Sequence, residues 1–528
     1  MVGAEADTFS GVIGTAILLM VFNFFVVVNV RFRPIVRSLS KERLFMSGIQ
    51  GRILEVHPPL VVDLDGTLLS SDMLFETAMA FIRHHPLQVL RIFAWLLRGK
   101  ASLKQGLALG TDIDVTLLPY HAAVIDYIQT QRQSGRLVVL ATACHDTLAS
   151  QIATHLQLFD QVLASDGLIN LSAHRKRDLL VSLYGEGGFD YIGNSRDDLC
   201  VWKVSRQSIV ASTLAGVERK ARALGNVAQV IKTASTRRHA WFKALRLHQW
   251  MKNTLIFVPL LAAHQLQNPL LMLDGLLAFL CFGLCASSVY LLNDLLDLAD
   301  DRHHHSKRLR PFASGQLSIK SGLVAIPLLL AAAFAGAMLT LPWQFSAVLA
   351  AYYLLTLVYS LYLKRHMAVD VIVLAMLYTT RILAGAAAFQ LPLTFWILAF
   401  SMFLFLSLAL VKRYAELRDA RMRNLTSRTR GRGYYPGDLE MIASLGASSG
   451  NLAVMVLALY IHEGATSALY QHPHAIWLAC PLLLFWITRI WMLTHRGEMN
   501  EDPVVFAIRD RVSQGIGFLF LTVFWVAA

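Results

Sequence analysis

The stretch YLLNDLLDLADDRHHHSKRLRPFASGQL (290–317) decides how this chain is interpreted. Asn293, Asp297 and Asp301 recur every four residues, so they share one face of a helix, and Asp294 lies beside them. Carboxylates at the end of an apolar helix are costly unless they bind a positive partner. Hard oxygen ligands suit Mg²⁺, which in turn binds diphosphate oxygens. The stretch therefore predicts a Mg²⁺–diphosphate site.

Three basic residues follow the carboxylates. Lys307, Arg308 and Arg310 can neutralise phosphate charge directly, because lysine and arginine both donate charge-assisted hydrogen bonds to phosphate oxygens. The order of acidic and then basic residues is typical of a binding site and not of a solvated loop.

The composition places this motif in a membrane protein. Of 528 residues 55% are hydrophobic and only 16% are charged, and the mean hydropathy is +0.50. The net charge of +13 fits basic cytoplasmic loops, since no nucleic-acid motif accompanies it. Five cysteines without a CxxC pair indicate neither a disulfide framework nor a zinc site.

Long apolar segments surround the motif and predict a bundle of about nine transmembrane helices. The first and last are short for a full span. The segments lie near 254–266, 270–292, 320–341, 344–362, 367–388, 393–411, 441–462, 475–494 and 513–528.

The connections between these segments alternate in charge. AAHQLQNP, LTLPWQ, AFQLP and HEGATSALYQHPHA contain no Lys or Arg, whereas the alternate connections contain many. The basic connections are therefore expected on the cytoplasmic side of the inner (plasma) membrane.

The part before the bundle has a different pattern. An uncharged run at 11–30 predicts a transmembrane anchor, and the basic cluster after it puts the following residues in the cytoplasm. From 57 to 230, short apolar runs alternate with helical stretches, which predicts an α/β domain with a parallel sheet. Residues 231–252 read as a basic amphipathic linker, so the bundle is expected to occupy 253–528.

The motif at 290–317 resembles the first aspartate-rich motif of the UbiA superfamily of intramembrane prenyltransferases. The resemblance implies a helical bundle around a cavity open to lipid, with Asn293, Asp294, Asp297 and Asp301 as Mg²⁺ ligands. It covers roughly residues 243–528.

Two further segments narrow the resemblance to the decaprenyl-phosphate phosphoribosyltransferase branch. RLHQWMKNTLIFVPLLA (246–262) looks like the entry segment of that branch, and YSLYLKRHMAVDVIVLAMLYTTRILAG (359–385) looks like its second motif. This second motif departs from the aspartate-rich one of aromatic prenyltransferases, because only one aspartate remains. The expected substrate-binding residues here are Lys252, Asn253, Lys364, Asp370, Tyr378 and Arg381. By helical periodicity Asp370, Tyr378 and Arg381 fall near one face.

The chemistry of the branch explains these cations. It transfers phosphoribose from phosphoribosyl diphosphate to a polyprenyl phosphate, and this anionic lipid acceptor calls for extra positive charge. Interfacial snorkelling explains Lys252 and Lys364 equally well, but Arg381 lies well inside an apolar helix. Lys412, Arg413 and Glu416 also match the branch, although the positive-inside rule accounts for them too.

The α/β part carries its own motif. VVDLDGTLL (61–69) is a buried strand running into a turn, and it places Asp63 and Asp65 at the carboxyl end of that strand, where α/β ligand sites lie. This resembles the first motif of the haloacid dehalogenase (HAD) superfamily of phosphatases. The resemblance implies Asp63 as nucleophile and Asp65 as general acid/base, with a helical cap over the site between about 70 and 135.

The other HAD motifs follow in order. Thr142 matches the second motif, Lys176 the phosphate-binding lysine, and IGNSRDD (192–198) the acidic fourth motif, with Asp198 in place. Asn194 stands at the first acidic position of this last motif. The resemblance implies Asp63, Asp65, Asn194 and Asp198 as the Mg²⁺ ligands of this domain. The amide oxygen of Asn194 can bind Mg²⁺ but adds no negative charge, so an active Mg²⁺-dependent phosphatase and a degenerate regulatory domain both remain open.

These observations predict a multi-domain enzyme: an all-α membrane bundle fused to an N-terminal anchor and an α/β, Rossmann-like HAD domain. The expected activity is Mg²⁺-dependent transfer of phosphoribose to a polyprenyl phosphate, with a phosphatase that acts on the product. Transfer of a prenyl group from a prenyl diphosphate to an aromatic acceptor and a non-catalytic membrane scaffold are the alternatives. The partners are a lipid, phosphoribosyl diphosphate and the membrane, but no nucleic acid.

Overall fold

The computed structural model describes residues 57–166, 169–212, 215–232, 237–424, 432–462, 470, 472–499 and 502–527. The predicted anchor at 11–30 lies outside these residues. The chain divides into two compact units, one comprising Met1–Trp241 with Asp294–Pro327 and the other Phe242–Asn293 with Leu328–Ala528. Each unit is described by itself.

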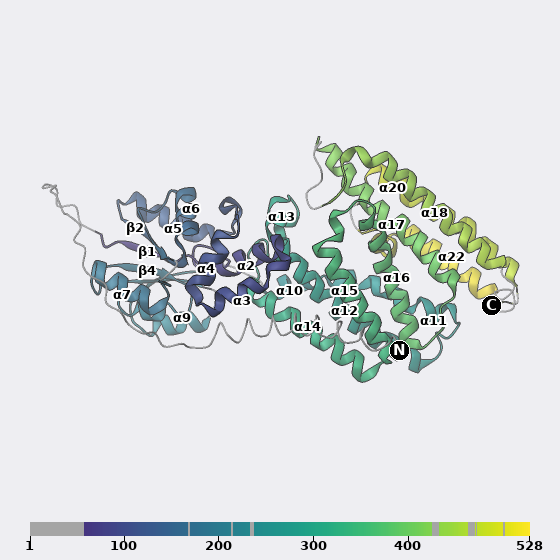
Figure 1. Cartoon of the computed structure of the whole chain (residues 1–528), viewed down its shortest axis with the longest axis horizontal. Helices are drawn as coiled ribbons and strands as arrows, with labels where there is room; N and C mark the ends of the chain where they lie inside the picture. Colours follow the sequence, from purple (N-terminus) through teal and green to yellow (C-terminus); the bar gives the residue numbers. More distant parts are fainter. Residues whose placement is uncertain are drawn as a thin grey trace, which may run out of the picture. The chain divides into compact units, whose positions relative to one another are not determined.

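A parallel six-stranded sheet forms the centre of the first unit. The strand order is β3-β2-β1-β4-β5-β6, so β1 lies in the middle (Figure 1). In register, Leu60 of β1 is opposite Val138 of β2 on one side and Asp190 of β4 on the other. The strands are β1 (Leu60–Val62), β2 (Val138–His145), β3 (Gln161–Ser165), β4 (Asp190–Gly193), β5 (Ser208–Ala211) and β6 (Val227–Ile231).

Helices join these strands and cover the sheet, as continuous apolar strands such as LVV of β1 require. The segment between β1 and β2 is helical, which is the arrangement expected of a cap. It contains α2 (Met73–His84), α3 (Leu90–Leu97), α4 (Lys100–Leu109) and α5 (Ala122–Gln133). The later helices are α6 (Asp146–Leu156), α7 (Ala173–Tyr184), α8 (Leu199–Trp202) and α9 (Ala215–Arg222), and α10 (Arg237–Leu245) crosses into the second unit.

A buried ion pair braces the start of β4. Asp190 is fully buried and accepts hydrogen bonds from Arg136 and from Arg206, the latter at 2.8 and 3.0 Å. Burial alone would raise the pKa of Asp190, but these two guanidinium groups outweigh it and hold the pKa below its ordinary value. The resulting stabilisation is complete above that ordinary value, roughly pH 3.9, and is lost as the pH falls through the folded-state pKa.

The aspartate-rich segment belongs to the same unit as the sheet. Helix α12 (Pro269–Leu296) ends within it, and α13 (Leu298–His303) and the 3₁₀ turn η4 (Lys307–Leu309) follow before α14 (Ile319–Thr340) begins. The predicted single face at 293–301 is interrupted, because Asp297 caps α13 and separates it from α12.

The second unit is a bundle of long apolar helices. In Figure 1, α18 runs beside α20, and α17 packs along α18. The helices of the bundle, besides α12 and α14, are α15 (Trp343–Leu361), α16 (Val369–Phe389), α17 (Phe395–Met422), α18 (Leu439–His462), α20 (Ala479–Arg496), α21 (Pro503–Arg509) and α22 (Arg511–Ala527).

Seven helices among the described residues are long and apolar enough to cross a membrane, against nine predicted. The segment predicted at 254–266 is broken into the 3₁₀ helix η3 (Leu247–Phe257) and the five-residue α11 (Val258–Ala262), with Pro259 at the start of α11. The last predicted segment corresponds to α22, which has 17 residues. These are the two segments that the sequence already showed to be short for a full membrane span.

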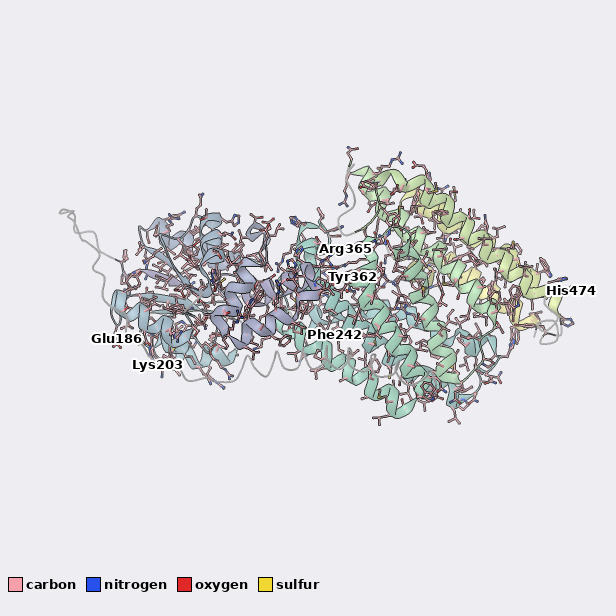
Figure 2. All side chains as sticks on the ribbon, viewed as in Figure 1. Glu186, Lys203, Phe242, Tyr362, Arg365 and His474 are labelled. Carbon is pink, nitrogen blue, oxygen red and sulfur yellow. The ribbon has the colours of Figure 1, made fainter. Side chains whose placement is uncertain are left out.

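Large apolar side chains are exposed along the bundle. Leu339 and Trp525 are 84% and 80% exposed, and Phe242 and Tyr362, which are labelled in Figure 2, are exposed as well. By contrast, polar residues such as Glu186 and Lys203 cover the α/β part. An apolar surface of this extent is unfavourable in water, so the bundle exposes it to lipid.

The brace at β4 gives a stability prediction. Asp190→Asn should lower the melting temperature of the α/β domain by roughly 6–20 °C, because removing one partner of a buried pair costs about 3–5 kcal/mol. Temperature-dependent limited proteolysis of the full chain in detergent, read at peptides from β4 and β5, measures this. Asp178→Asn is the control, since its pair with Arg177 is exposed. Equal melting temperatures for the two variants would contradict the brace.

Candidate functional site

The carboxyl edge of the sheet gathers the predicted phosphatase residues. β1 ends at Val62, so Asp63 follows it directly, and Asn194 directly follows the neighbouring strand β4. Parallel strands present their carboxyl ends at one edge, which is where open α/β folds bind ligands.

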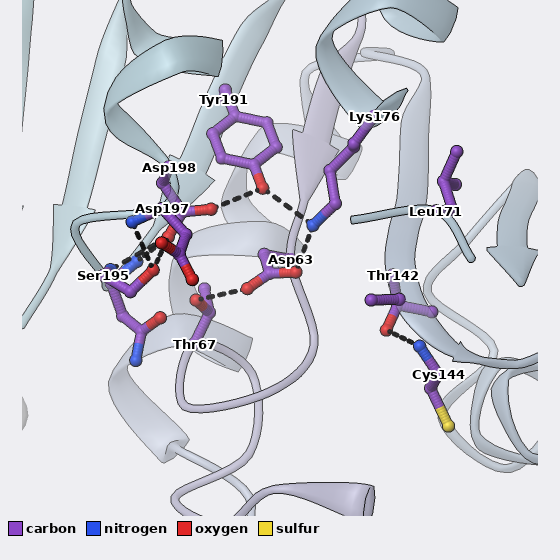
Figure 3. A network of polar contacts seen from close by, with 12 residues as sticks. Asp63, Thr67, Thr142, Cys144, Leu171, Lys176, Tyr191, Ser195, Asp197 and Asp198 are labelled. Carbon is purple, nitrogen blue, oxygen red and sulfur yellow. Dashed lines mark hydrogen bonds and ion pairs between the residues drawn. The ribbon is translucent and has the colours of Figure 1, made fainter. Parts of the chain in front are cut away.

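One hydrogen-bonded network joins three of these residues (Figure 3). Lys176 Nζ, from α7, lies 2.6 Å from Asp63 Oδ1 and donates to the hydroxyl of Tyr191 at 3.0 Å. Tyr191 in turn donates to Asp198 Oδ1 at 2.9 Å. The hydroxyl of Thr67 donates to Asp63 Oδ2 at 3.3 Å. Asp63, Lys176 and Asp198 therefore share one buried site.

The charges in this network compete. Burial raises the pKa of Asp63 to about 6, and repulsion from Asp198 adds to the rise while Lys176 opposes it. Burial by itself would lower the pKa of Lys176, but Asp63 and Asp198 outweigh it and raise that pKa. The lysine thus stays protonated between two carboxylates, where it can also hold a phosphate oxygen.

Asp65 contacts the start of helix α2. It accepts a hydrogen bond from the backbone N–H of Met73 at 2.8 Å. Burial, with repulsion from Asp72, raises the pKa of Asp65 to about 8. The carboxyl group therefore holds a proton at neutral pH, as a general acid requires.

A cavity of about 330 Å³ opens beside Asp65. Lys104, from cap helix α4, donates to the carbonyl of Ala143 at 2.5 Å and to Asn170 Oδ1 at 2.8 Å. These bonds tie the cap to the carboxyl edge of the sheet, and burial lowers the pKa of Lys104. The cavity has room for a small phosphorylated group next to the acid.

Thr142 and Asn194 are held by local contacts. The hydroxyl of Thr142 accepts a hydrogen bond from the N–H of Cys144, and in Figure 3 it stands apart from the network around Asp63. The side chain of Asn194 packs against Gly66, whose φ of +76° suits glycine and whose Cβ, if present, would collide with that amide.

The donor set at this edge fits Mg²⁺. Asp63 and Asp198 repel one another, and a divalent cation relieves such repulsion. In the described part of the chain no three His, Cys, Asp or Glu side chains converge as a metal site of their own. The amide oxygen of Asn194, backbone oxygens and water would complete the shell, as Mg²⁺ commonly accepts.

The aspartate-rich segment forms a second acidic cluster in the same unit. Arg310 Nη1 lies 3.1 Å from Asp294 Oδ1 and 2.7 Å from Asp301 Oδ2. Burial, reinforced by Asp294, raises the pKa of Asp301 to about 6. Asp297 instead pairs with Arg83 of α2 at 2.5 Å. The structure thus brings together Asp294, Asp301 and Arg310 and directs Asp297 elsewhere.

The cluster is suited to a cation. Asn293 belongs to the second unit and is described by itself: its Oδ1 atom is buried without a hydrogen-bond partner, which is costly unless a ligand satisfies it. Arg310 stands between two carboxylates where another positive group could also bind. Lys307 and Arg308 lie in the exposed turn η4 beside it.

The second unit holds a cluster of opposite sign. Asp502, at the start of α21, accepts from Lys252 at 2.7 Å, from Lys412 at 3.3 Å and from the hydroxyl of Tyr378 at 2.9 Å. The ring of Tyr378 lies 5.3 Å from Lys252 Nζ and 5.6 Å from the guanidinium of Arg381. Two lysines therefore share one carboxylate, and Arg381 lies against the tyrosine ring that bonds to it.

Arg381 is the most informative member. It is only 4% exposed, yet it donates to neutral acceptors: Asn253 Oδ1 at 3.2 Å, the carbonyl of Leu377 at 2.7 Å and the hydroxyl of Tyr352 at 3.4 Å. A buried guanidinium with uncharged partners favours an anionic ligand.

Two other predicted residues lie elsewhere. Asp370 is fully buried and pairs with Arg413 at 2.8 Å, and Arg413 also binds Glu416. It does not join Tyr378 and Arg381, although the three residues share a helix. Lys364 is buried in the 3₁₀ turn η5 (Leu363–Arg365).

Sequence reasoning missed three residues of these clusters. Asp502 carried a usable signal, since Asp followed by Pro is a common way to begin a helix. Tyr191 and Lys104 carried none, because their roles arise only when β4 and the cap meet the carboxyl edge of the sheet.

Comparisons with known proteins show which family the chain belongs to. Residues 254–521 match the UbiA prenyltransferase family. The chain is 37% identical over 473 residues to the uncharacterized protein y4nM of Sinorhizobium fredii, covering 89% of this chain and 91% of that protein. It is 30% identical over 292 residues to decaprenyl-phosphate phosphoribosyltransferase of Mycobacterium tuberculosis, covering 54% of this chain and 91% of the relative.

A solved structure of a substrate-bound phosphoserine phosphatase complex covers 35% of this chain and 97% of its own, with 13% identity and a TM-score of 0.25. The chain is thus a multi-pass membrane enzyme that belongs to the UbiA prenyltransferase family and carries an N-terminal α/β domain built on a parallel sheet.

Proposed function

We propose that this enzyme transfers phosphoribose from phosphoribosyl diphosphate to a polyprenyl phosphate and that its α/β domain then removes the 5-phosphate from the product. The observation that carries the proposal is Arg381, a buried cation whose partners are neutral. An anionic lipid acceptor supplies the missing charge, whereas an aromatic acceptor needs no such cation. The relative from Mycobacterium tuberculosis, a decaprenyl-phosphate phosphoribosyltransferase by name, supports the same assignment.

The acidic cluster is assigned to the donor. Asp294 and Asp301, with Asn293, would hold Mg²⁺, whereas Asp297 stays paired with Arg83. Arg310, with Lys307 and Arg308, would contact the diphosphate as it departs. Bound Mg²⁺ would supply charge neutralisation to the leaving diphosphate here and to the transferring phosphoryl group in the α/β domain. Asp63, Asp198 and Asn194 are the ligands that we assign to the latter.

The basic cluster is assigned to the acceptor. Arg381, Lys252 and Lys412 would bind the lipid phosphate, and Asn253 and Tyr378 hold Arg381 and Lys252 in place. One oxygen of the lipid phosphate attacks the anomeric carbon as the bond from this carbon to the diphosphate breaks. Because the attacking phosphate is already anionic, this step requires no strong general base.

The α/β domain is assigned the second reaction. Asp63 would attack the 5-phosphate, and Asp65, which holds a proton at neutral pH, would donate it to the departing ribose oxygen. Asp65 would then take a proton from the water that hydrolyses the aspartyl phosphate and releases inorganic phosphate. Lys176 and Thr142 are both assigned to binding the phosphate oxygens.

The two reactions share one side of the membrane in this proposal. An inner-membrane location with the α/β domain in the cytoplasm follows from the basic connections. The anchor at 11–30, the α/β domain at 57–230, the linker at 231–252 and the bundle at 253–528 remain the proposed division. Tethering raises the effective concentration of the phosphorylated product near the phosphatase.

The donor site gives the first test. Asp294→Ala should lower transfer of radiolabelled phosphoribose into the lipid phase at least about 100-fold, since a carboxylate that holds the metal of the leaving group is lost. Asp274→Ala, near the other end of the same helix α12, is the control. Near-normal turnover in Asp294→Ala would place the diphosphate elsewhere. Label moving only from a prenyl diphosphate to an aromatic acceptor would favour the aromatic branch.

The acceptor site gives the second test of the proposed function. Arg381→Gln should lower kcat/KM for polyprenyl phosphate by about 10- to 100-fold, the loss expected for a charged hydrogen bond. The KM for phosphoribosyl diphosphate should stay within about threefold. Steady-state kinetics at varied lipid concentration measure both. Arg489→Gln, whose arginine already pairs with Asp510, is the control. An equal loss toward both substrates would argue against a lipid-phosphate role.

The phosphatase site gives the third test of the proposed function. Asp63→Asn should leave transfer intact and make the 5-phosphorylated lipid accumulate, because the amide cannot form the aspartyl phosphate. Mass spectrometry resolves the lipid products of wild type and variant. A wild type that also stops at the phosphorylated product, with lipid and Mg²⁺ in excess, would show that the domain acts on something else or is silent.

A further inference from the structure

The cap helix α2 holds the aspartate-rich segment through a buried ion pair. Arg302, which directly follows Asp301, binds Glu76 with two bonds, of 2.6 and 3.1 Å. Its third nitrogen donates to the carbonyl of Ala313 at 3.0 Å. The side chains of Arg302 and Glu76 are only 7% and 4% exposed. All these residues lie within the same compact unit.

A second arginine on α2 makes similar contacts. Arg83, two helical turns after Glu76 and so on the same face, binds Asp297 at 2.5 Å and Asp300 at 2.9 Å. Glu76 and Arg83, on one face of α2, therefore contact residues at the start of α13 and near its end. An isolated surface pair would contribute little, but a bidentate pair at this level of burial fixes the position of both side chains.

Glu76 also reaches the phosphatase loop. Its Oε1 accepts from the hydroxyl of Ser71 at 2.5 Å, and the carbonyl of Ser71 accepts from the N–H of Gly66 at 3.1 Å. Gly66 directly follows Asp65. Two hydrogen bonds thus separate the carboxylate held by Arg302 from the loop that carries the general acid.

We infer that Glu76 is a positioning residue for both reactions: it sets α13, and with it Asp297 and Asp301, and it sets the loop of Asp65. The α/β domain therefore contributes to transfer independently of its own hydrolysis. Because Glu76 contacts both Arg302 and Ser71, a change at Arg302 also affects the phosphatase loop. The inference rests on the proposed function for the identity of the transfer reaction.

The test uses the full chain in detergent with Glu76→Gln, Arg302→Gln and the charge-swapped double variant Glu76→Arg/Arg302→Glu. Glu218→Gln is the matched control, since it removes the exposed pair with Arg222 in the same domain. Hydrogen exchange over 294–317 should rise at least threefold in each single variant and not in the control. The double variant should exchange less than either single variant.

Activity supplies the second readout. In Glu76→Gln, kcat for transfer should fall at least tenfold with less than a threefold change in KM for phosphoribosyl diphosphate, because misplaced carboxylates slow a step more than they weaken binding. In Arg302→Gln, hydrolysis of para-nitrophenyl phosphate should fall at least threefold. If a glutamine variant does not accumulate, Glu76→Asp and Arg302→Lys replace it and should show smaller changes of the same sign.

Two outcomes overturn the inference. One is unchanged exchange over 294–317 in both single variants, and the other is raised exchange with unchanged transfer and hydrolysis. Failure of the proposed function looks different. If wild type transfers no phosphoribose, the exchange and the para-nitrophenyl phosphate measurements still decide whether Glu76 couples the two segments.

Discussion

A carboxylate taken out of water needs a positive partner, and this constraint shapes each charged cluster described above. Asp63 lies against Lys176, Asp294 and Asp301 share Arg310, and Glu76 holds Arg302. Each pair joins segments that are distant in sequence or separated by a turn. The positions of the reactive groups therefore depend on where the opposite charges are found.

The two kinds of cluster differ in the sign of the charge that remains. In the aspartate-rich segment Asp294 and Asp301 both pair with Arg310, and we assign this acidic segment to a metal-bound diphosphate. Around Asp502 several cations share one carboxylate, so the cluster attracts an anion. A reaction between a metal-bound diphosphate and a lipid phosphate needs one site of each sign.

Much of this could be predicted where a single short stretch carries the signal. VVDLDGTLL and NDLLDLADDR each hold their candidate ligands within a few residues, but the break at Asp297 interrupts the helical face expected for the second stretch. Asp502 and Glu76 escaped prediction because their partners Lys252 and Arg302 lie more than 200 residues away. Asp370 was predicted beside Arg381 from helical periodicity, but a closer cation, Arg413, on the neighbouring helix binds it instead. Periodicity gives the face of a helix and not the element that packs against it.

The order of the strands has a consequence for synthesis. β1 emerges first but pairs with β2 and β4, so the sheet cannot form until residue 193 has left the ribosome. All six strands are nevertheless complete before α12, the first long apolar helix described, begins at Pro269. Because domains generally fold as units from the N-terminus during translation, the α/β domain can fold while the bundle is still unmade. The segment 294–317 is synthesised later and packs against a domain that has already folded. Its conformation then depends on α2, the helix that it contacts.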